Sequence, residues 1–334
     1  MARRTVALIF SLEIQRQVVS AATREKMARE FNVLGPVAEG KVTQEQAVEL
    51  LRDADGCMTG WGSPNLSAEV LARAPKLRIM AHSAGSVKPF VSDALFERGI
   101  VVTSASATIA VDVAHFTLAE IVIGLKNVME LSVRVAQGEF HGIKGHCRTD
   151  DPRGCTVGVI SASHVGRSVL KLLPHFEMRA LLYDPYVSSG QARALGAEKV
   201  ELDELFERSD VVSCHAPSIP ATRHMVNAAR LAKMGDGAVF INTARGSCVD
   251  EQALIAELQK RRIWAFLDVF DPEPPAPGSP LLSCPNLTMT PHIAGSSGRG
   301  RLRLGEQALN ELEAYFTGKP VQYPVTKEML ERIG

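Results

Sequence analysis

Short apolar runs alternate with segments of helical spacing along the first third of the chain. Buried strands are predicted at residues 5–10, 32–34, 56–59, 77–81 and 100–103. Apolar residues recur at helical spacing over residues 12–31, 43–51, 67–74 and 92–97. Thr43 and Gln46 have the spacing of a capping box at the start of one of these helices. Strands that alternate with helices in this way predict a parallel sheet covered on both faces.

The same alternation resumes after one long helix, predicted over residues 111–135, and a polar linker at 137–153. Further strands are predicted at residues 155–160, 180–183, 211–215, 238–242, 263–269 and 287–290, and further helices at 166–173, 202–208, 231–234, 250–260 and 301–317. A chain of 334 residues exceeds the usual size of a single core. We therefore predict two doubly wound parallel-sheet α/β domains, with a nucleotide-binding domain at 108–298 inserted into a discontinuous domain formed by 1–107 plus 299–334.

Residues 153–186 outline a βαβ dinucleotide-binding unit of the Rossmann type, in which a second strand ends on Asp184. In such a unit the helix N-terminus faces a pyrophosphate and the acid accepts from the ribose hydroxyls. The G-x-G-x-x-G frame falls here on Ser161, Ser163 and Gly166, so only the third glycine is kept. We expect strain of roughly 1–2 kcal/mol wherever a serine must adopt positive φ, and weakened rather than abolished cofactor binding. Taken alone, the segment is equally compatible with an ordinary βαβ unit.

The composition contains no electrostatic signal for nucleic acid or an anionic membrane, because 37 basic residues balance 37 acidic ones. No apolar run is expected to reach transmembrane length, and the stretch MARRTVALIF is better explained as a first strand than as a signal sequence. No metal site is predicted, because the cysteines lack ligand spacing; they are Cys57, Cys147, Cys155, Cys214, Cys248 and Cys284. Reduced core or loop thiols indicate a cytoplasmic protein.

Three predicted strands of the second half end on titratable groups. The first ends in INTARG on Arg245, the second in LDVFDPEP on acids that include Glu273, and the third in TPHIAG on His292. A guanidinium can fork onto a carboxylate, an imidazole can exchange a proton, and an acid can hold that imidazole. A single Arg–Glu pair is more often a surface ion pair, and a single histidine is more often a cap. The coincidence of three strand ends with a βαβ turn favours one catalytic edge.

Together these motifs resemble the D-isomer-specific 2-hydroxyacid dehydrogenases, the family of glycerate, lactate and 3-phosphoglycerate dehydrogenases. The resemblance covers nearly the whole chain and is carried in order by HSAGS, ERGIVVTS, VAHFTLAE, TVGVISASHVG, LLYDPY, SDVVSCHAP, TRHMVN, INTARGSCVDEQAL, LDVFDPEP and TPHIAG. It implies a Rossmann-type nucleotide domain, a flavodoxin-like substrate domain and a homodimer, to which the apolar face of the helix at 111–135 is suited. The implied activity is NADH-dependent reduction of a small 2-oxo acid to a D-2-hydroxy acid.

The resemblance also implies roles for individual residues. Arg245 would bind the substrate carboxylate, and His292 would be the general acid/base with Glu273 as its partner. The residues implied in cofactor binding are Ser161, Ser163, His164, Val165, Gly166, Asp184, Pro185, His215, Ala216, Pro217, Thr243, Ala244, Asp268 and Gly295. The residues assigned to the substrate, besides Arg245, are Trp61, Ala84, Gly85 and Ser86. Asp184 favours NAD over NADP, because a 2′-phosphate would face a carboxylate.

Several alternatives remain open in the sequence. Asp268 could cap a loop, His215 could be a satisfied core histidine, and Trp61 could be a packed surface aromatic. His164 stands where the family often has an arginine over the pyrophosphate. The altered glycine turn is also compatible with an NAD(H)-sensing, corepressor-like interaction protein with weak or no turnover. A formate-oxidising relative is disfavoured, because such relatives usually carry glutamine where this chain has Glu273.

Overall fold

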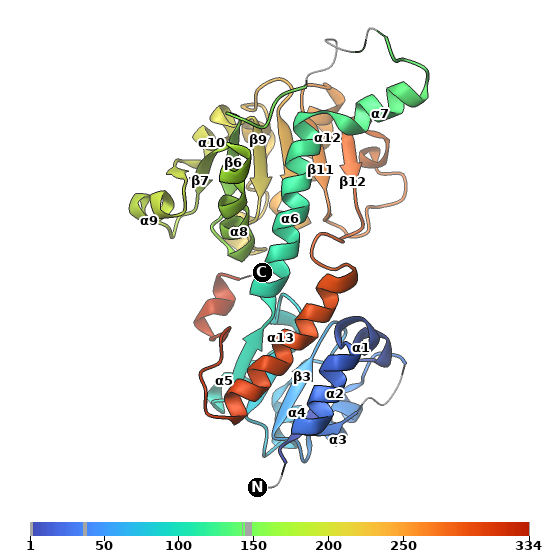
Figure 1. The fold of residues 1–334 in the computed structure, drawn as a ribbon, viewed down its shortest axis with the longest axis vertical. Helices are drawn as coiled ribbons and strands as arrows, with labels where there is room; N and C mark the ends of the chain where they lie inside the picture. Colours follow the sequence, from blue (N-terminus) through green and yellow to red (C-terminus); the bar gives the residue numbers. More distant parts are fainter. Residues whose placement is uncertain (1–2, 36–38, 142, 144–148, 334) are drawn as a thin grey trace. The chain divides into compact units, whose positions relative to one another are not determined.

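The computed structural model describes residues 3–35, 39–141, 143 and 149–333 (Figure 1). Contacts within the chain divide it into two compact units, one formed by Met1–Ile109 with Ser296–Gly334 and the other by Ala110–Gly295. The two divisions in the chain lie two and three residues from the boundaries expected from the sequence. Part of the expected linker at 137–153 lies outside the described residues, as does Cys147.

The first unit contains a parallel sheet in the order β2-β1-β3-β4-β5. Its strands are β1 (Thr5–Leu8), β2 (Asn32–Leu34), β3 (Gly56–Thr59), β4 (Ile79–His82) and β5 (Val101–Ser104). Its helices are α1 (Leu12–Val18), α2 (Ala21–Glu30), α3 (Gln44–Leu51), α4 (Ala68–Ala72), α5 (Asp93–Glu97) and α13 (Gly298–Phe316), with 3-10 turns η1 (Lys88–Phe90) and η6 (Glu328–Glu331). One apolar cluster joins the sheet to α3, α4 and α5, and a second joins it to α2 and α13. The sheet is therefore covered on both faces, as predicted.

The second unit contains a parallel sheet in the order β12-β11-β10-β9-β6-β7-β8. Its strands are β6 (Thr156–Ile160), β7 (Arg179–Tyr183), β8 (Glu198–Lys199), β9 (Val211–Cys214), β10 (Val239–Asn242), β11 (Trp264–Leu267) and β12 (Leu287–Met289). Its helices are α6 (Ser106–Leu125), which begins just before the unit, α7 (Val128–Ala136), α8 (His164–Leu172), α9 (Ser189–Ala194), α10 (Leu202–Arg208), α11 (Ala228–Leu231) and α12 (Glu251–Gln259). Its 3-10 turns are η2 (Leu173–Phe176), η3 (Pro220–Thr222), η4 (Gly246–Cys248) and η5 (Pro280–Ser283).

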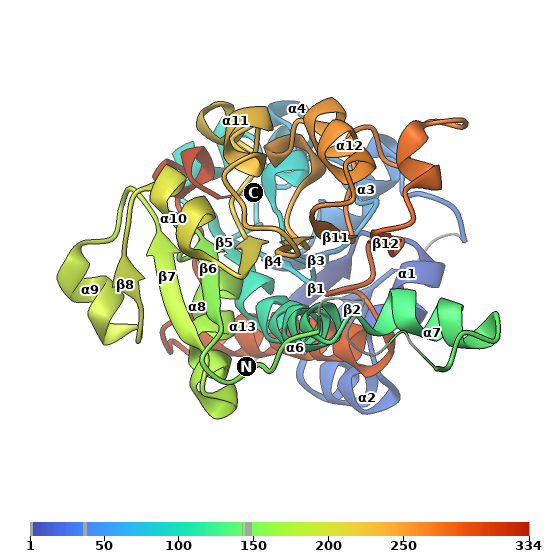
Figure 2. The ribbon, with the colours of Figure 1, turned by 90° about the horizontal axis from the view of Figure 1, so that it is seen from above.

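Helices cover both faces of this second sheet as well. Helices α6 and α8 pack on one face, whereas α10, α11 and α12 pack on the other (Figure 2). The strand order reverses beside β6, which pairs with β7 on one side and with β9 on the other. In open parallel sheets, ligands bind at the carboxyl ends of the strands where the order reverses. The fold therefore locates the expected nucleotide site at the end of β6.

Three helical predictions were wrong in their extent, and one of them, at 231–234, lies earlier in the chain as α11 (Ala228–Leu231). The segment 12–31 forms two helices, because Ser20 begins a new one by accepting from the Thr23 N–H at 3.0 Å. The predicted helix at 111–135 also divides, between α6 and α7. Asn127 adopts a left-handed φ of 48° there and donates from Nδ2 to Glu130 Oε2 at 3.1 Å. Asparagine tolerates this conformation better than most residues, so apolar periodicity alone missed the break. The capping box at Thr43 and Gln46 is confirmed.

Helix α6 has the length and apolar composition of a membrane-spanning helix, contrary to the sequence-based expectation that no segment would. Core helices pass the same test. Residues of α6 pack in the second unit's core, where Gly124 lies against Val239 and Phe266 so closely that a Cβ would come within 2.9 Å of Val239. The helix also buries Glu120. These contacts with the sheet account for the apolar residues on the buried side of the helix.

Candidate functional site

The strands of the second sheet all run in one direction, so the residues that follow them lie at one edge. These residues are Ser161 after β6, Asp184 after β7, His215 after β9, Thr243 to Arg245 after β10, Asp268 after β11 and Thr290 to His292 after β12. The sequence-predicted cofactor and catalytic residues of this unit are therefore gathered by the sheet itself. Most of them lie in the connections that follow the strands, where the backbone can turn a side chain toward a ligand, and His164, Val165 and Gly166 lie in the first turn of α8.

The two serines of the altered glycine turn behave differently. Ser161 adopts a left-handed φ of 79°, the conformation for which glycine is favoured. Ser163 has an ordinary φ of −59° and caps α8, accepting from the Gly166 N–H at 3.3 Å and donating to the His215 carbonyl at 3.0 Å. A Cβ on Gly166 would lie 2.0 Å from the Ser161 carbonyl oxygen, so this glycine is needed for close packing. Backbone strain therefore falls on Ser161 and not on Ser163.

The carboxylate of Asp184 is buried against the turn. Its Oδ2 accepts from the Ala162 N–H at 2.8 Å and from Ser161 Oγ at 3.5 Å, while Oδ1 accepts from the Tyr186 N–H at 2.8 Å. These bonds fix the orientation of the acid before any ligand is bound. The following Pro185 is exposed, and Val165 in the first turn of α8 is half-buried.

The basic groups beside the turn are His164 and Arg167. Partial burial, and then the positive charge of Arg167, lower the pKa of His164, so this histidine is neutral at physiological pH. Arg167 donates from Nε to the Ala162 carbonyl at 2.7 Å. The permanent positive charge at the start of α8 is therefore that of Arg167, one turn beyond the position where the sequence placed His164.

His215 is buried, and burial lowers its pKa to about 3, so the imidazole is neutral. Its Nε2 shares a hydrogen bond with Ser213 Oγ at 3.0 Å, and its Nδ1 has no hydrogen-bond partner among the described residues. Ala216 is buried beside it, and the Pro217 carbonyl accepts from the Thr222 hydroxyl at 2.5 Å. The contacts of His215 are those of a core histidine with one nitrogen unused.

Arg245 lies on a loop whose shape is fixed by Asn242. Asn242 accepts from the Ala244 N–H at 3.0 Å and donates to the Arg245 carbonyl at 2.9 Å. The guanidinium donates from Nη1 to the Ala244 carbonyl at 2.7 Å. Burial lowers the pKa of Arg245, whereas the charges of Cys248 and Glu273 oppose that shift, so the side chain stays cationic near neutral pH.

Gly246 brings the Arg245 loop against the segment that leads to Glu273. A Cβ at this position would lie 2.0 Å from the Phe270 carbonyl carbon and 2.6 Å from the Asp271 nitrogen. Any side chain there would collide with backbone, so the two segments can approach only because residue 246 is glycine. This close packing brings Arg245 into the electrostatic reach of Glu273.

His292 and Glu273 form the hydrogen-bonded pair that the sequence predicted. The distance from His292 Nδ1 to Glu273 Oε1 is 2.7 Å, and Glu273 Oε2 accepts from the Phe270 N–H at 3.3 Å. Both side chains are open to solvent, with exposures of 49% and 41%. His292 also adopts a left-handed φ of 55°. Such a conformation in a non-glycine residue requires support from its surroundings and is common at functional sites.

Asp268 supplies that support. Its buried carboxylate accepts from Thr290 Oγ1 at 2.6 Å and from the N–H groups of Ile293 and Ala294, each at 2.8 Å. The acid thereby ties both sides of the His292 turn to the end of β11. These contacts are those of the loop-capping alternative, and they hold Ala294 and Gly295 in buried positions.

Sequence analysis missed two groups behind this edge. Thr117 on α6 shares a hydrogen bond with the buried Thr243 hydroxyl at 3.0 Å. Glu120, one turn further along α6, is buried near Asp268. An acid inside an apolar helical pattern was the available signal, because glutamate is seldom buried without a partner. No group of three or more His, Cys, Asp or Glu side chains suited to a metal occurs within residues 3–35, 39–141, 143 and 149–333.

The remaining predicted residues lie at the carboxyl edge of the first sheet. Trp61 follows β3 and is half-buried, with the Arg301 guanidinium 5.7 Å from its ring centre. The loop after β4 is held through its carbonyls, since Ser104 Oγ donates to Gly85 at 2.6 Å and the Ala105 N–H donates to Ala84 at 3.1 Å. Ser86 is half-buried in the same loop. Packing against Arg301 corresponds to the surface-aromatic alternative for Trp61.

The seven-stranded sheet, its edge turn and the buried Asp184 define an α/β dinucleotide-binding protein. Residues 118–294 match the sequence model described as "D-isomer specific 2-hydroxyacid dehydrogenase, NAD binding domain". The chain is 32% identical over 297 residues to a glyoxylate reductase from Korarchaeum cryptofilum, covering 88% of this chain and 89% of that protein. It therefore belongs to the D-isomer-specific 2-hydroxyacid dehydrogenases, a family of oxidoreductases, and the resemblance found in the sequence is confirmed.

Two further comparisons extend this result. The chain is 31% identical over 290 residues to a D-3-phosphoglycerate dehydrogenase from Methanocaldococcus jannaschii; the match covers 85% of this chain but only 53% of that protein. A crystal structure of Rhodotorula graminis D-mandelate dehydrogenase aligns with a TM-score of 0.82 and 23% identity, covering 98% of each chain. The second comparison shows the shared fold and confirms the predicted class of two parallel-sheet α/β domains.

Proposed function

We propose that the protein is an NAD(H)-dependent D-2-hydroxyacid dehydrogenase that reduces a small 2-oxo acid, with His292 as the general acid and base. The observation that carries this proposal is the 2.7 Å hydrogen bond between His292 and Glu273 beside the cationic Arg245. A proton donor held by a carboxylate, next to a guanidinium, is the set of groups that reduction of a 2-oxo acid requires. The supporting relatives are named for this chemistry.

The side chains at the proposed site have separate roles in the reaction. Arg245 forks onto the substrate carboxylate and polarises the neighbouring oxo group, because a guanidinium matches a carboxylate in shape and charge. Glu273 accepts from His292 Nδ1, which leaves Nε2 to give its proton to the substrate oxygen. In the reverse direction the same nitrogen takes the proton back. Asp268 keeps the imidazole turn in place throughout.

The carboxyl edge of the second sheet fits a nicotinamide dinucleotide. The turn before α8 passes so close to Gly166 that a Cβ has no room there, and the oriented Asp184 lies beside it. The residues assigned to the cofactor are Ser161, Ser163, His164, Val165, Gly166, Asp184, Pro185, His215, Ala216, Pro217, Thr243, Ala244, Asp268 and Gly295. When bound, NADH supplies the hydride. We propose NAD rather than NADP, because the Asp184 carboxylate would repel a 2′-phosphate.

The proposed substrate is a small 2-oxo acid such as glyoxylate or hydroxypyruvate. The loop with Ala84, Gly85 and Ser86 and the ring of Trp61 are proposed to bind it, in addition to Arg245. The carbonyls of Ala84 and Gly85 are bound within the first unit, which fixes this loop in one shape. The 2-oxo acids of this substrate class differ in the group attached beyond C2, and the fit of that group determines which acid is bound.

A panel of 2-oxo acids tests the proposal, with NADH and NADPH supplied in parallel and loss of the NADH absorbance as the readout. We expect turnover with NADH on at least one acid, little turnover with NADPH, and loss of turnover in His292→Ala. NADH binding without turnover on any acid would contradict the enzyme and support the interaction protein instead. Turnover that survives in His292→Ala would contradict the assigned general acid.

We also propose that the protein is a homodimer that associates through its second unit. Helix α7 exposes several large apolar side chains, and the segment after it adds another: Val128, Met129, Val133, Val135 and Phe140. Apolar groups gathered on one surface commonly mark an interface. Light scattering on a size-exclusion column is expected to give twice the chain mass of 36.1 kDa, and Val133→Glu is expected to shift it toward the monomer.

A further inference from the structure

Two basic side chains lie on either side of the loop after β3 in the first unit. The Arg301 guanidinium lies over the ring of Trp61, and a Cβ added to Gly62 would lie 3.9 Å from Lys41 Cγ. Arg301 is half-buried and Lys41 is exposed. Within the described part of the chain, neither of them is paired with a carboxylate. Positive charge gathered without an acidic partner attracts an anion.

The Arg301 guanidinium is held in one position by neutral groups. Its Nε donates to the Ser296 carbonyl at 2.6 Å and to Ser296 Oγ at 3.0 Å, while its Nη1 donates to Gln17 Oε1. The acid in this network, Glu13, is bonded to Gln17 at 3.5 Å and not to the guanidinium. The central guanidinium carbon lies 5.7 Å from the ring centre of Trp61, within the range of a cation–π contact.

These contacts leave one end of the guanidinium unused. Its Nη2 makes no hydrogen bond to any residue that the structure describes. A fixed, planar guanidinium loses little side-chain freedom when it binds a further group, and its shape suits a carboxylate or a phosphate. Arg301 therefore has both the charge and the rigidity of an anion-binding group.

The Trp61 loop adjoins the loop that is proposed to hold the substrate. Residue 60 is glycine, and a Cβ there would lie only 3.2 Å from Ser83 Oγ, at the start of the 83–86 loop. Ser83 Oγ also donates to the Thr59 carbonyl at the end of β3, at 2.8 Å. The loop that supports Arg301 is thus joined to the loop proposed to bind the first carboxylate of the acid.

We propose that Arg301 and Lys41 form an anion subsite for a second anionic group, a carboxylate or a phosphate, which the 2-oxo acid carries beyond C2. This inference rests on the proposed function and names the substrates that it favours, which are 2-oxo acids with two anionic groups. Arg301 binds the second group and takes no part in proton transfer. Lys41 adds a weaker attraction, because its exposed charge is screened by water.

The test compares acids of matched length with and without the second anionic group. The carboxylate arm pairs 2-oxoglutarate with 2-oxopentanoate, and the phosphate arm pairs the phosphate ester of hydroxypyruvate with hydroxypyruvate itself. Binding is measured by titration calorimetry on the full chain with NAD⁺, which cannot reduce these acids, and kcat and KM are measured with NADH. In at least one arm the dianionic acid is expected to bind about 10–100-fold more tightly than its partner.

Arg301→Gln should weaken binding of the dianionic acid about 10-fold or more, through KM rather than kcat, and leave its partner within about threefold. Lys41→Gln should weaken the dianionic acid about threefold. Arg24→Gln removes the same charge from an exposed arginine on α2 and should leave both affinities unchanged. If Arg301→Gln does not fold, Arg301→Lys replaces it, since it keeps the charge without the planar guanidinium and should lose a smaller part of the preference.

The arm with the larger preference identifies the second group as a carboxylate or a phosphate. Equal affinity for both members in each arm would overturn the inference, and so would an Arg301→Gln variant that loses both members equally, since that result shows a structural role. Tighter binding of a dianionic acid without turnover on any acid would sink the proposed reaction alone. Turnover of the partner acids without a preference for the dianionic ones would sink the subsite alone.

Discussion

At each end of strand β11 a basic and an acidic side chain approach to nearly the same distance, in opposite surroundings. At the amino end, Arg262 Nη2 lies 2.6 Å from Glu257 Oε1, with exposures of 24% and 4%. At the carboxyl end, His292 lies 2.7 Å from Glu273, with exposures of 49% and 41%. Distance alone does not separate the two pairs. What separates them is whether each group still has a hydrogen-bonding site to offer.

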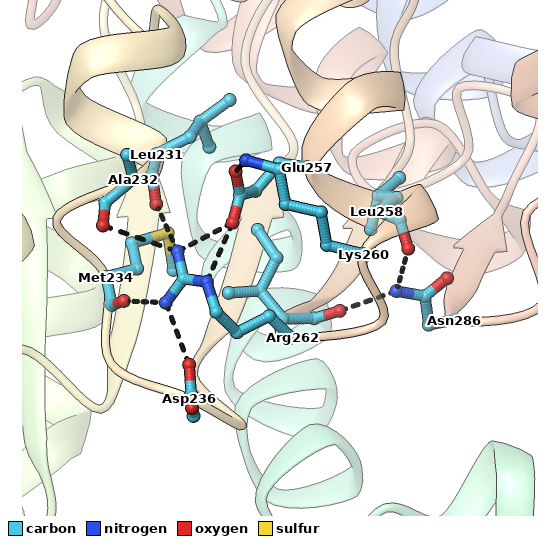
Figure 3. Close-up of polar contacts among 10 residues, drawn as sticks. Leu231, Ala232, Met234, Asp236, Glu257, Leu258, Lys260, Arg262 and Asn286 are labelled. Carbon is cyan, nitrogen blue, oxygen red and sulfur yellow. Dashed lines mark hydrogen bonds and ion pairs between the residues drawn. The ribbon is translucent and has the colours of Figure 1, made fainter.

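The side chains of Arg262 and Glu257 are hydrogen-bonded to several surrounding residues (Figure 3). Arg262 donates to the carbonyls of Leu231 and Met234 at the end of α11, and to Asp236. Burial opposes the charge of Glu257, but hydrogen bonds from Lys260 and Arg262 outweigh it and lower the pKa of Glu257. At the carboxyl end, only one nitrogen of His292 is bound by Glu273. In the proposed function, the other nitrogen of His292 exchanges a proton with the substrate, whereas the guanidinium of Arg262 is occupied in holding the fold.

The largest effect that would sharpen this comparison is expected at His292. Replacing His292 by Ala should lower kcat by about 10²–10⁴-fold, because a positioned general acid contributes that much. The melting temperature should change little, since the side chain is half exposed. Steady-state kinetics and calorimetry on the same sample measure both. A large fall in the melting temperature would break the comparison.

Replacing Arg262 by Met should have the opposite result. Glu257 would stay buried with Lys260 as its remaining partner among the described residues, and the carbonyls of Leu231 and Met234 would lose the guanidinium as a donor. The free energy of unfolding should therefore fall by about 3 kcal/mol while kcat at 20 °C stays within about twofold. Urea denaturation gives the first quantity. Arg262→Lys is the matched control, because it keeps the positive charge but lacks the planar guanidinium. Its free energy of unfolding should fall by less than that of the Met variant. A Met variant that is stable but inactive would contradict the division of roles.

Glu120 brings a pH dependence of stability to the carboxyl end. Burial, and then the charge of Asp268, raise the pKa of Glu120 to about 8, so the folded chain keeps a proton that the unfolded chain has lost. Stability should therefore fall as pH rises from about 4.5 to 8 and then level off. The size is about 5 kcal/mol over that window, from 3.5 pKa units at 1.36 kcal/mol each. Glu120→Gln should flatten this part of the curve in chemical denaturation at pH 5, 6.5 and 8. An unchanged slope in the variant would show that the acid is not buried in its neutral form.

The smallest effects are expected at the two serines of the turn. Ser161→Gly relieves a left-handed φ of 79°, so it should stabilise the fold by about 1 kcal/mol and tighten NADH binding up to about tenfold. Ser163→Gly removes a helix cap with an ordinary φ, so it should cost a few tenths of a kcal/mol without tightening NADH binding. NADH titration of the pair checks the difference. Equal gains from both substitutions would mean that backbone strain does not limit affinity.

The sequence allowed most of the fold to be predicted, because its strands are short apolar runs and parallel strands order their loops at one edge. Arg245, Glu273 and His292 were predictable for that reason, since each follows a strand. The break at Asn127 was not, because the apolar period continues through it and the left-handed turn is supported by a side-chain bond to Glu130 that the pattern does not show. The unequal behaviour of Ser161 and Ser163 was also hidden, since φ is decided by the path of the turn.

The protonation state of Glu120 and the particular donors to Asp268 were beyond prediction for another reason. A carboxyl group reveals its state only through what surrounds it, and those surroundings come from α6, β11 and the loop after β12 together. The pattern of residues along one segment does not show which residues of other segments will lie beside it. The same holds for Arg262, whose partners lie on α11, α12 and the turn before β10.

Gly246 has a consequence for the geometry of the reaction. The backbone that carries Arg245 meets the backbone at Phe270 with no space for even a methyl group between them. In the proposed reaction, the loop that would anchor the substrate acid is therefore held by main chain against the segment that leads to Glu273, the proposed partner of the general acid. Substitution of Gly246 by any larger residue is expected to push these two segments apart.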